Sequence, residues 1–214
     1  MVEECHMTSS SEHWDNIFKT REDPNLGWYE QDAAQTFAMF EGIPDWSAAK
    51  VFLPGAGTSV LVDQLLQQGN ALILNDISSE ALDKLKARIG EHRDHVTWLC
   101  QDISTPLMST VPQVDLWIDR AVLHFLQEES DIAGYFTNLK TVLRAGGYVL
   151  FAEFSLSGAP QCAGLKLHRY SVDELTERLG SDFSLLRQSD YAYTNPSGDP
   201  RPYIYALYQR KQAC

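Results

Sequence analysis

Residues 50–76 read KVFLPGAGTSVLVDQLLQQGNALILND, and the order of patterns in this stretch decides the fold. The run 51–53 is apolar at every position, as a central strand of a parallel sheet must be. Gly55 and Gly57 predict a tight turn after it, where backbone can approach a ligand closely. A helical pattern and a second apolar run follow. Strand, glycine turn, helix and strand in this order predict half of a nucleotide-binding Rossmann unit.

Asp76 ends the second predicted strand, 19 positions after Gly57. Nucleotide-binding units of this kind carry an acidic residue at a spacing of about 20, where its carboxylate binds ribose hydroxyls. Alone, the two glycines would indicate only a tight strand-to-helix turn. Ser59 stands where a dinucleotide fingerprint has its third glycine, and this departure disfavours a pyrophosphate ligand. The spacing therefore predicts a nucleotide site, and the rest of the chain has to identify the nucleotide.

An ordered series of motifs continues through the middle of the chain. The series comprises PGAGTS at 54–59, NDIS at 75–78, QDIS at 101–104, VDLWIDRAVLHFL at 114–126 and LRAGGYVLFAEF at 143–154. It resembles the motifs of class I S-adenosylmethionine-dependent methyltransferases over about residues 48–155. The resemblance implies a three-layer, doubly wound α/β fold around a mostly parallel seven-stranded sheet that ends in a C-terminal antiparallel hairpin. It also implies S-adenosylmethionine as the cofactor and S-adenosylhomocysteine as the product.

Roles transfer to the positions that match the family motifs. These positions are Gly55, Ala56 and Gly57 under the methionine part of the cofactor, Asp76 and Ile77 at the ribose, Asp102 and Ile103 at the adenine, and Asp119 and Arg120 near the methionine end and the methyl group. The chain departs from the family at Leu53, because an acidic residue is common two positions before the first glycine.

The implied chemistry is an in-line displacement in which an acceptor atom attacks the methyl group. Asp119 and His124 are the candidates for orienting or deprotonating the acceptor. His124 could equally be a helix residue that packs against the sheet. Glu30 and Asp32 are candidates for holding a cationic acceptor, although carboxylates near a helix start need no function.

Two segments outside the motif series are candidates for acceptor recognition. Residues 1–47 are predicted to form an N-terminal helical lid or cap on a Rossmann-like domain at 48–214, within a single domain overall. Trp14, Trp28 and Tyr29 would cover the cofactor, or would simply pack a leading helix onto the sheet. The second segment, 154–170, is long for a strand-to-helix link, and long loops are often functional.

The long link carries Cys162, His168 and Arg169. The two basic side chains could bind an anionic acceptor or lower the pKa of the Cys162 thiol, but a bystander cysteine and a surface turn are the alternatives. After the link, Ser171 and Glu174 have the spacing of a capping box. The two strand patterns at 183–193 and 203–210 lie too close together for a helical crossover and are expected to pair antiparallel.

Composition narrows the class of protein further. The chain has 214 residues, of which 44% are hydrophobic, enough for one domain with a substantial core. Its formal net charge of −12 would repel a nucleic acid, and no cluster of basic residues offsets it. Four scattered cysteines (Cys5, Cys100, Cys162 and Cys214) indicate reduced thiols and no metal site. Without a long apolar run or a signal-peptide pattern, we expect a cytoplasmic protein with no membrane partner.

The sequence leaves three functions open. The first is a methyltransferase for a small-molecule acceptor, with sulfur or nitrogen as the favoured nucleophile, because the loops are short. The second is a protein lysine methyltransferase, whose basic target would suit an acidic surface. The third is a non-catalytic partner that binds an adenosyl nucleotide, against which the intact acidic series at Asp76, Asp102 and Asp119 argues.

Overall fold

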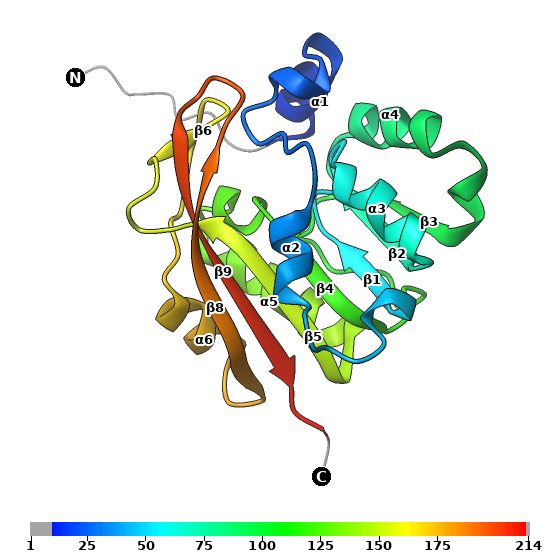
Figure 1. Cartoon of the computed structure of the whole chain (residues 1–214), viewed down its shortest axis with the longest axis vertical. Helices are drawn as coiled ribbons and strands as arrows, with labels where there is room; N and C mark the ends of the chain where they lie inside the picture. Colours follow the sequence, from blue (N-terminus) through cyan, green and yellow to red (C-terminus); the bar gives the residue numbers. More distant parts are fainter. Residues whose placement is uncertain (1–9, 213–214) are drawn as a thin grey trace.

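The computed structural model describes residues 10–212, apart from the side chains of 91–93. Seven strands form one sheet in the order β3-β2-β1-β4-β5-β9-β8 (Figure 1). They are β1 (Lys50–Leu53), β2 (Ala71–Asp76), β3 (Val96–Cys100), β4 (Val114–Arg120), β5 (Leu143–Phe154), β8 (Phe183–Thr194) and β9 (Pro200–Arg210). The first five are mutually parallel, and β9 pairs antiparallel with both β5 and β8. The predicted seven-stranded sheet with its closing hairpin is confirmed.

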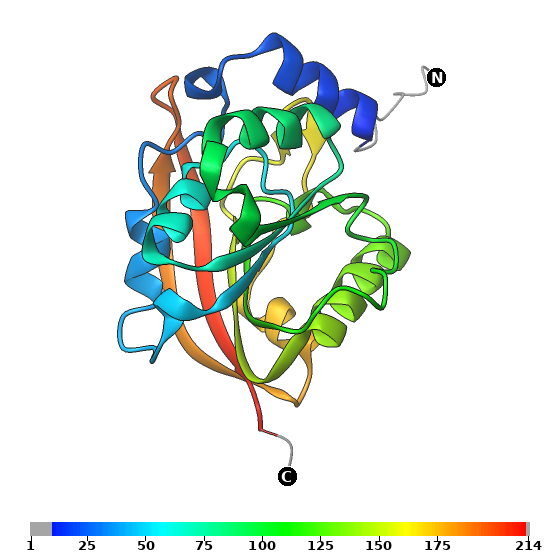
Figure 2. The same ribbon diagram turned by 90° about the vertical axis from the view of Figure 1, so that its right-hand side faces the viewer.

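Helices cover both faces of this sheet and make it the middle of three layers (Figure 2). One face packs against α2 (Ala34–Met39), α3 (Val60–Gln68) and α4 (Ser79–Ile89), and the other against α5 (Glu129–Val142) and α6 (Val172–Leu179). The first helix, α1 (Ser11–Thr20), packs on α4 instead of on a sheet face. Short 3-10 helices and strands complete the fold: η1 (Asp23–Asn25), η2 (Trp46–Ala48), η3 (Gly90–His95), η4 (Leu123–Phe125), β6 (Gln161–Cys162) and β7 (Leu165–Lys166).

Local signals explain where the helices begin and end. The Ser59 side chain accepts a hydrogen bond from Leu61 N at the start of α3, and Gly69 ends that helix in a left-handed conformation. At α6 only one half of the predicted capping box forms: the Ser171 hydroxyl accepts a hydrogen bond from Glu174 N at 3.1 Å. The Glu174 carboxylate does not complete the box. It binds His168 and Arg178 instead.

The core of the sheet centres on Trp117 in β4. Its ring stacks on Phe52 of β1 with ring centroids 4.3 Å apart and an interplanar angle of 2°. Such an aromatic pair contributes about 0.5–1.5 kcal/mol beyond the area it buries. The buried indole N–H donates to the Tyr135 hydroxyl of α5 at 2.8 Å, so its polar atom is satisfied. This packing fixes the height of α5 against the strand whose end carries Asp119 and Arg120.

Some sequence predictions lie outside the described residues. They are the predictions for Cys5 and Cys214 and the expectation that residues 1–9 contain no signal-peptide pattern. Cys100 and Cys162 are free thiols, as expected. Between residues 10 and 212, no helix is long and apolar enough to cross a membrane.

Candidate active site

A cavity of about 340 Å³ lies at the carboxyl ends of the parallel strands. Ligands of open α/β sheets bind at this edge, where the strand order reverses on either side of β1 and β4. Most of the predicted site residues line it: Trp14, Trp28, Tyr29, Gly55, Ala56, Gly57, Asp76, Ile77, Asp102, Ile103, Arg120, His124 and Cys162. Asp119, His168 and Arg169 are not part of its wall. The volume falls within the range of small-molecule sites.

The glycine turn between β1 and α3 forms the floor of the cavity. Gly55 and Gly57 have φ angles of +51° and +52°, a region that favours glycine. A Cβ atom on Gly55 would stand 2.4 Å from Cγ2 of Val122, which no side chain could tolerate without movement. Ala56 N donates to the carbonyl of Asn75 at 2.9 Å and ties the turn to the end of β2. Gly55 is therefore required by both backbone conformation and space, whereas Gly57 is favoured by its backbone conformation.

Asp76 is buried at the end of β2 and faces both the cavity and the glycine turn. Its Oδ2 accepts from Gly57 N at 2.7 Å and its Oδ1 from Ser78 N at 2.8 Å. Burial raises the pKa of this carboxyl to about 6, although both amide hydrogen bonds act to lower it. A carboxylate can accept about four hydrogen bonds, so Asp76 keeps capacity for a further donor, as a ribose-binding acid requires.

Asp102 occupies the corresponding place after β3. It lines the cavity and accepts a hydrogen bond from Ser104 N at 2.8 Å, in a turn that also buries Ile103 against the sheet. The two acids that the sequence assigned to one nucleoside thus lie on a common wall. They are brought there by strands that are neighbours in the sheet.

Helix α1 covers the glycine turn. Trp14 packs edge-on against Phe125 and Trp28, with centroids 4.8 and 5.6 Å apart. Asp15 on the same helix accepts from the Ser78 hydroxyl at 2.6 Å and from Glu80 N at 3.2 Å. Ser78 is the residue that caps the start of α4, two positions after Asp76. Helix α1 therefore supplies an extra acceptor at the start of α4. Trp14 and Trp28 therefore both pack the N-terminal segment and line the cavity, so packing of this segment is compatible with a role in covering the cofactor.

Arg120 and Glu30 form a nearly buried ion pair in the cavity wall. Nη2 of Arg120 lies 2.7 Å from Oε1 of Glu30, and Nη1 donates to the carbonyl of Trp28 at 3.0 Å. The guanidinium also lies over the rings of Tyr193 and Tyr203, 5.5 and 5.8 Å from their centroids. Glu30, a candidate for holding a cationic acceptor, is thus already paired with a cation of the protein.

Asp119 lies behind the cavity wall and is fully buried. It accepts hydrogen bonds from the Tyr135 hydroxyl at 2.5 Å, from Val122 N at 3.1 Å and from Leu123 N at 3.2 Å. Burial and the neighbouring carboxyl of Glu153 raise its pKa well above the usual range. Its contacts hold the turn that leads into η4, the short helix that carries His124.

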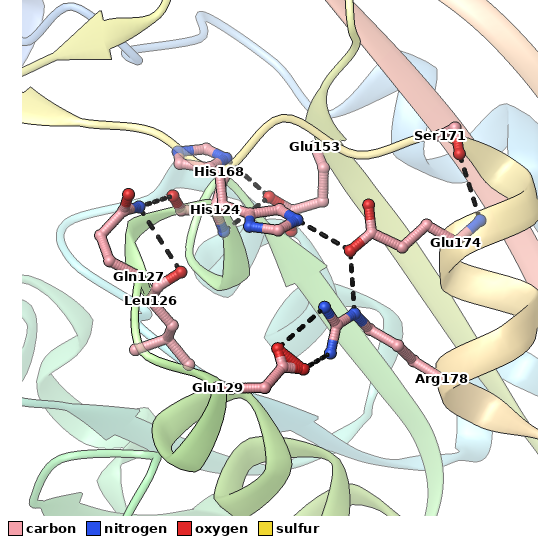
Figure 3. Close-up of polar contacts among 9 residues, drawn as sticks. All are labelled: His124, Leu126, Gln127, Glu129, Glu153, His168, Ser171, Glu174 and Arg178. Carbon is pink, nitrogen blue, oxygen red and sulfur yellow. Dashed lines mark hydrogen bonds and ion pairs between the residues drawn. The ribbon is translucent and has the colours of Figure 1, made fainter.

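His124 is a fully buried residue of the cavity wall, placed by η4. Its Nδ1 lies 2.6 Å from Oε2 of Glu153, and its backbone N–H donates to the same oxygen at 3.3 Å (Figure 3). Burial lowers the pKa of the imidazole to about 3 and raises the pKa of Glu153 to about 8. The ring is therefore neutral at physiological pH. Sequence analysis missed Glu153, whose one signal was an acid inside the apolar run of β5.

The link between β5 and α6 contributes only one of its three predicted residues to the cavity. Cys162 lies in β6 on the wall, and burial raises the pKa of its thiol. His168 instead binds Glu174, with Nε2 and Oε1 2.7 Å apart, and Arg169 donates to the carbonyls of Leu156 and Gly158 at 3.0 and 3.2 Å (Figure 3 shows the His168 contact). Both basic side chains thus fasten the link. In the described part of the chain, no cluster of three or more His, Cys, Asp or Glu side chains could hold a metal ion.

Known proteins share part of this sequence and most of this fold. Residues 54–149 match the family model described as "Methyltransferase domain". No curated protein matches the chain in sequence. Among solved structures, a methyltransferase from Anabaena variabilis that depends on S-adenosylmethionine matches with a TM-score of 0.76 at 15% identity, over 94% of this chain and 93% of that one.

Two further structures align over nearly the whole chain. A protein described by the conversion of a disulfide bond into a thioacetal group during echinomycin biosynthesis has a TM-score of 0.72 at 15% identity, over 95% of this chain and 94% of that one. The N-methyltransferase NodS from Bradyrhizobium japonicum, in complex with S-adenosyl-L-homocysteine, has a TM-score of 0.68 at 14% identity, over 94% and 97%. At these identities the likeness is one of fold.

Fold and site together define a Rossmann-like nucleotide-binding domain with its cavity at the switch point of the sheet. Residues 54–149 thus match a methyltransferase domain, and the chain shares its fold with S-adenosylmethionine-dependent methyltransferases of known structure. The resemblance inferred from the motif series is confirmed.

Proposed function

We propose that this protein transfers a methyl group from S-adenosylmethionine to a small-molecule acceptor. One observation carries the proposal. One cavity of about 340 Å³ is lined both by the glycine turn, Asp76 and Asp102 and by Arg120 at the end of β4 and His124 in η4. A cofactor site and space for an acceptor are therefore continuous.

The glycine turn, Asp76 and Asp102 fit an adenosyl cofactor. Asp76 has free lone pairs for ribose hydroxyls, and the turn at Gly55 and Gly57 brings backbone to the cavity without side chains. Asp102 and Ile103 would bind the adenine edge and face. When bound, the cofactor would supply an electrophilic methyl group on a sulfonium.

The contribution of the protein would then be mainly positioning. Holding two reactants in line can lower a barrier by about 7–11 kcal/mol. Trp14 and Phe125 line the cavity and pack against each other, and His124 is a wall residue whose ring is neutral at physiological pH. Asp119, behind the wall, would hold the turn that carries His124.

Sulfur or nitrogen acceptors suit this site best. A thiol with a pKa near 8.5 costs about 2 kcal/mol to ionise at pH 7, whereas a lysine amine near 10.4 costs about 4–5 kcal/mol to deprotonate. Glu30 is not free to receive a basic peptide, because Arg120 is its ion-pair partner. These features favour a small molecule over a protein lysine.

Calorimetric titration tests the proposal directly. S-adenosylmethionine, S-adenosylhomocysteine and NAD would be titrated in parallel into the wild type and Asp76→Asn, with the exposed Asp190→Asn as the matched control. We expect adenosyl ligands to bind the wild type and the control and to bind Asp76→Asn at least about tenfold more weakly, a difference of about 1.4 kcal/mol. Preference for NAD, or no adenosyl binding, would overturn the proposal. Turnover with labelled cofactor and panels of thiols and amines would then identify the acceptor, whereas binding without any turnover would favour a non-catalytic partner.

A further inference from the structure

The imidazole of His124 is held on one side only. Nδ1 lies 2.6 Å from the Glu153 carboxylate without regular hydrogen-bond geometry, whereas Nε2 is buried with neither a hydrogen bond nor an ion pair among the described residues. The ring is further fixed by Phe125 and Phe154, with centroids 4.5 and 5.0 Å away. A buried polar atom without a partner is costly, so such an atom in a cavity wall calls for a ligand.

We propose that Glu153 is the positioning residue of this site, which fixes the His124 ring through Nδ1 so that Nε2 meets the methyl acceptor. The inference rests on the proposed methyl transfer and deepens it. The acceptor would be a protonated nucleophile, such as a thiol or a neutral N–H, whose proton passes to Nε2 as its sulfur or nitrogen forms the new bond to carbon. The positive charge that His124 then acquires would be balanced by the Glu153 carboxylate.

The protonation state of Glu153 decides what Nε2 can do. While the Glu153 carboxyl is protonated, it donates to Nδ1, so the hydrogen of the neutral ring is on Nε2 and that atom cannot act as a base. Once Glu153 is ionised, Nδ1–H donates to the carboxylate, and Nε2 presents a lone pair. Since burial raises the pKa of Glu153 to about 8, the ring would change tautomer as the pH rises through that value.

Other ionisable groups surround this pair. They are Asp119 and Arg120 at the end of β4, Tyr135 on α5, Tyr170 before α6 and Tyr203 on β9. Arg120 stays cationic beside Glu30, and burial raises the pKa of all three tyrosines, so none of the four changes charge near pH 8. Asp119 is the competitor, because burial raises its pKa too.

Two readouts test the inference. The first is nitrogen-15 NMR of histidine-labelled protein from pH 6.5 to 9.5, with His124→Gln used to assign the ring. It needs neither cofactor nor acceptor. The second is the pH profile of kcat and KM with the acceptor found in the panel. Both would be measured on wild type, Glu153→Gln and Asp119→Asn. Glu174→Gln is the matched control, because it alters the other His–Glu contact, which lies off the cavity.

In the wild type and in Glu174→Gln we expect the hydrogen to move from Nε2 to Nδ1 as the pH rises through about 8, and kcat to rise with it. In Glu153→Gln the amide oxygen would accept from Nδ1–H at every pH. The tautomer change and the rise in kcat would both vanish, and kcat at pH 9 would fall about 10- to 100-fold with KM little changed.

A wild-type ring whose hydrogen stays on Nε2 up to pH 9.5 would overturn the inference without any variant, so misfolding of Glu153→Gln cannot hide the answer. A tautomer change that survives in Glu153→Gln, or that disappears in Asp119→Asn alone, would overturn it as well. Absence of adenosyl binding would overturn the proposed function instead, since the ring titration does not depend on it.

Discussion

Arg120 and Glu30 join two distant parts of the chain inside the cavity wall, with Nη2 and Oε1 2.7 Å apart and both side chains about nine-tenths buried. Arg120 ends β4, whereas Glu30 lies in the segment between η1 and α2. The pair therefore anchors the segment between η1 and α2 to the end of β4. The guanidinium also contacts the Trp28 carbonyl and two tyrosine rings, so little of it remains exposed.

Replacing Glu30 should be destabilising. Glu30→Gln leaves the buried guanidinium of Arg120 uncompensated, and breaking a buried pair in this way costs about 3–5 kcal/mol. Urea unfolding would measure the loss against Glu41→Gln, a change at an exposed position nearby. Equal unfolding free energies for the two variants would show that the pair contributes nothing to stability.

Binding of S-adenosylhomocysteine should depend on pH through Asp76. Its raised pKa of about 6 means that the carboxyl is protonated below that pH, and a protonated carboxyl accepts ribose hydroxyls less well. Affinity should therefore be constant above pH 7 and fall by up to about tenfold per unit below pH 6. Titration calorimetry at several pH values would follow this fall, which should be missing from Asp76→Asn. The same slope in the variant would assign the titration to another group.

A methyl group at the glycine turn should disrupt both fold and site. In Gly55→Ala the new Cβ would collide with Val122, in addition to the strain of a positive φ angle. Overpacking of this kind costs about 1–3 kcal/mol beyond the conformational penalty of about 1–2 kcal/mol. Gly42→Ala is the control, because Gly42 also has a positive φ but open space around it. Thermal unfolding should separate the two variants, and coincident melting curves would exclude the steric argument.

Trp14→Ala should weaken cofactor binding more than it weakens the fold. It removes the ring that packs on Phe125 and lines the cavity, and we expect the dissociation constant for S-adenosylhomocysteine to rise at least about tenfold. Trp46→Ala provides the comparison, since Trp46 packs on Phe37 and Phe40 and does not line this cavity. A smaller binding defect in Trp14→Ala than in Trp46→Ala would argue against a covering role for α1.

The sequence predicted best what local patterns determine. The glycine turn and Asp76 are joined by one strand, one helix and a fixed spacing, so their geometry follows from a short stretch of chain. The C-terminal hairpin followed from the short distance between two strand patterns, and the structure confirms its antiparallel pairing.

The contacts that sequence reasoning could not supply are those between distant residues. Arg120 and Glu30 are 90 positions apart, and His124 and Glu153 are 29 apart. No periodicity links such pairs, because their meeting depends on the register of β4 against β5 and on the path of the segment between η1 and α2. The same limit applies to His168 and Arg169, whose neighbours in sequence gave no sign that they would fasten a loop.

The position of β9 has a consequence for how the chain is made. It lies between β5 and β8, although it follows both in sequence. On the ribosome, β8 therefore emerges before the strand with which it pairs, and the hydrogen-bonding edge of β5 stays open until β9 has been synthesised. Unpaired edges are where nascent chains associate wrongly. β9 is thus the strand that joins β8 to the rest of the sheet, and the acidic net charge of the chain helps keep neighbouring nascent copies apart until it does.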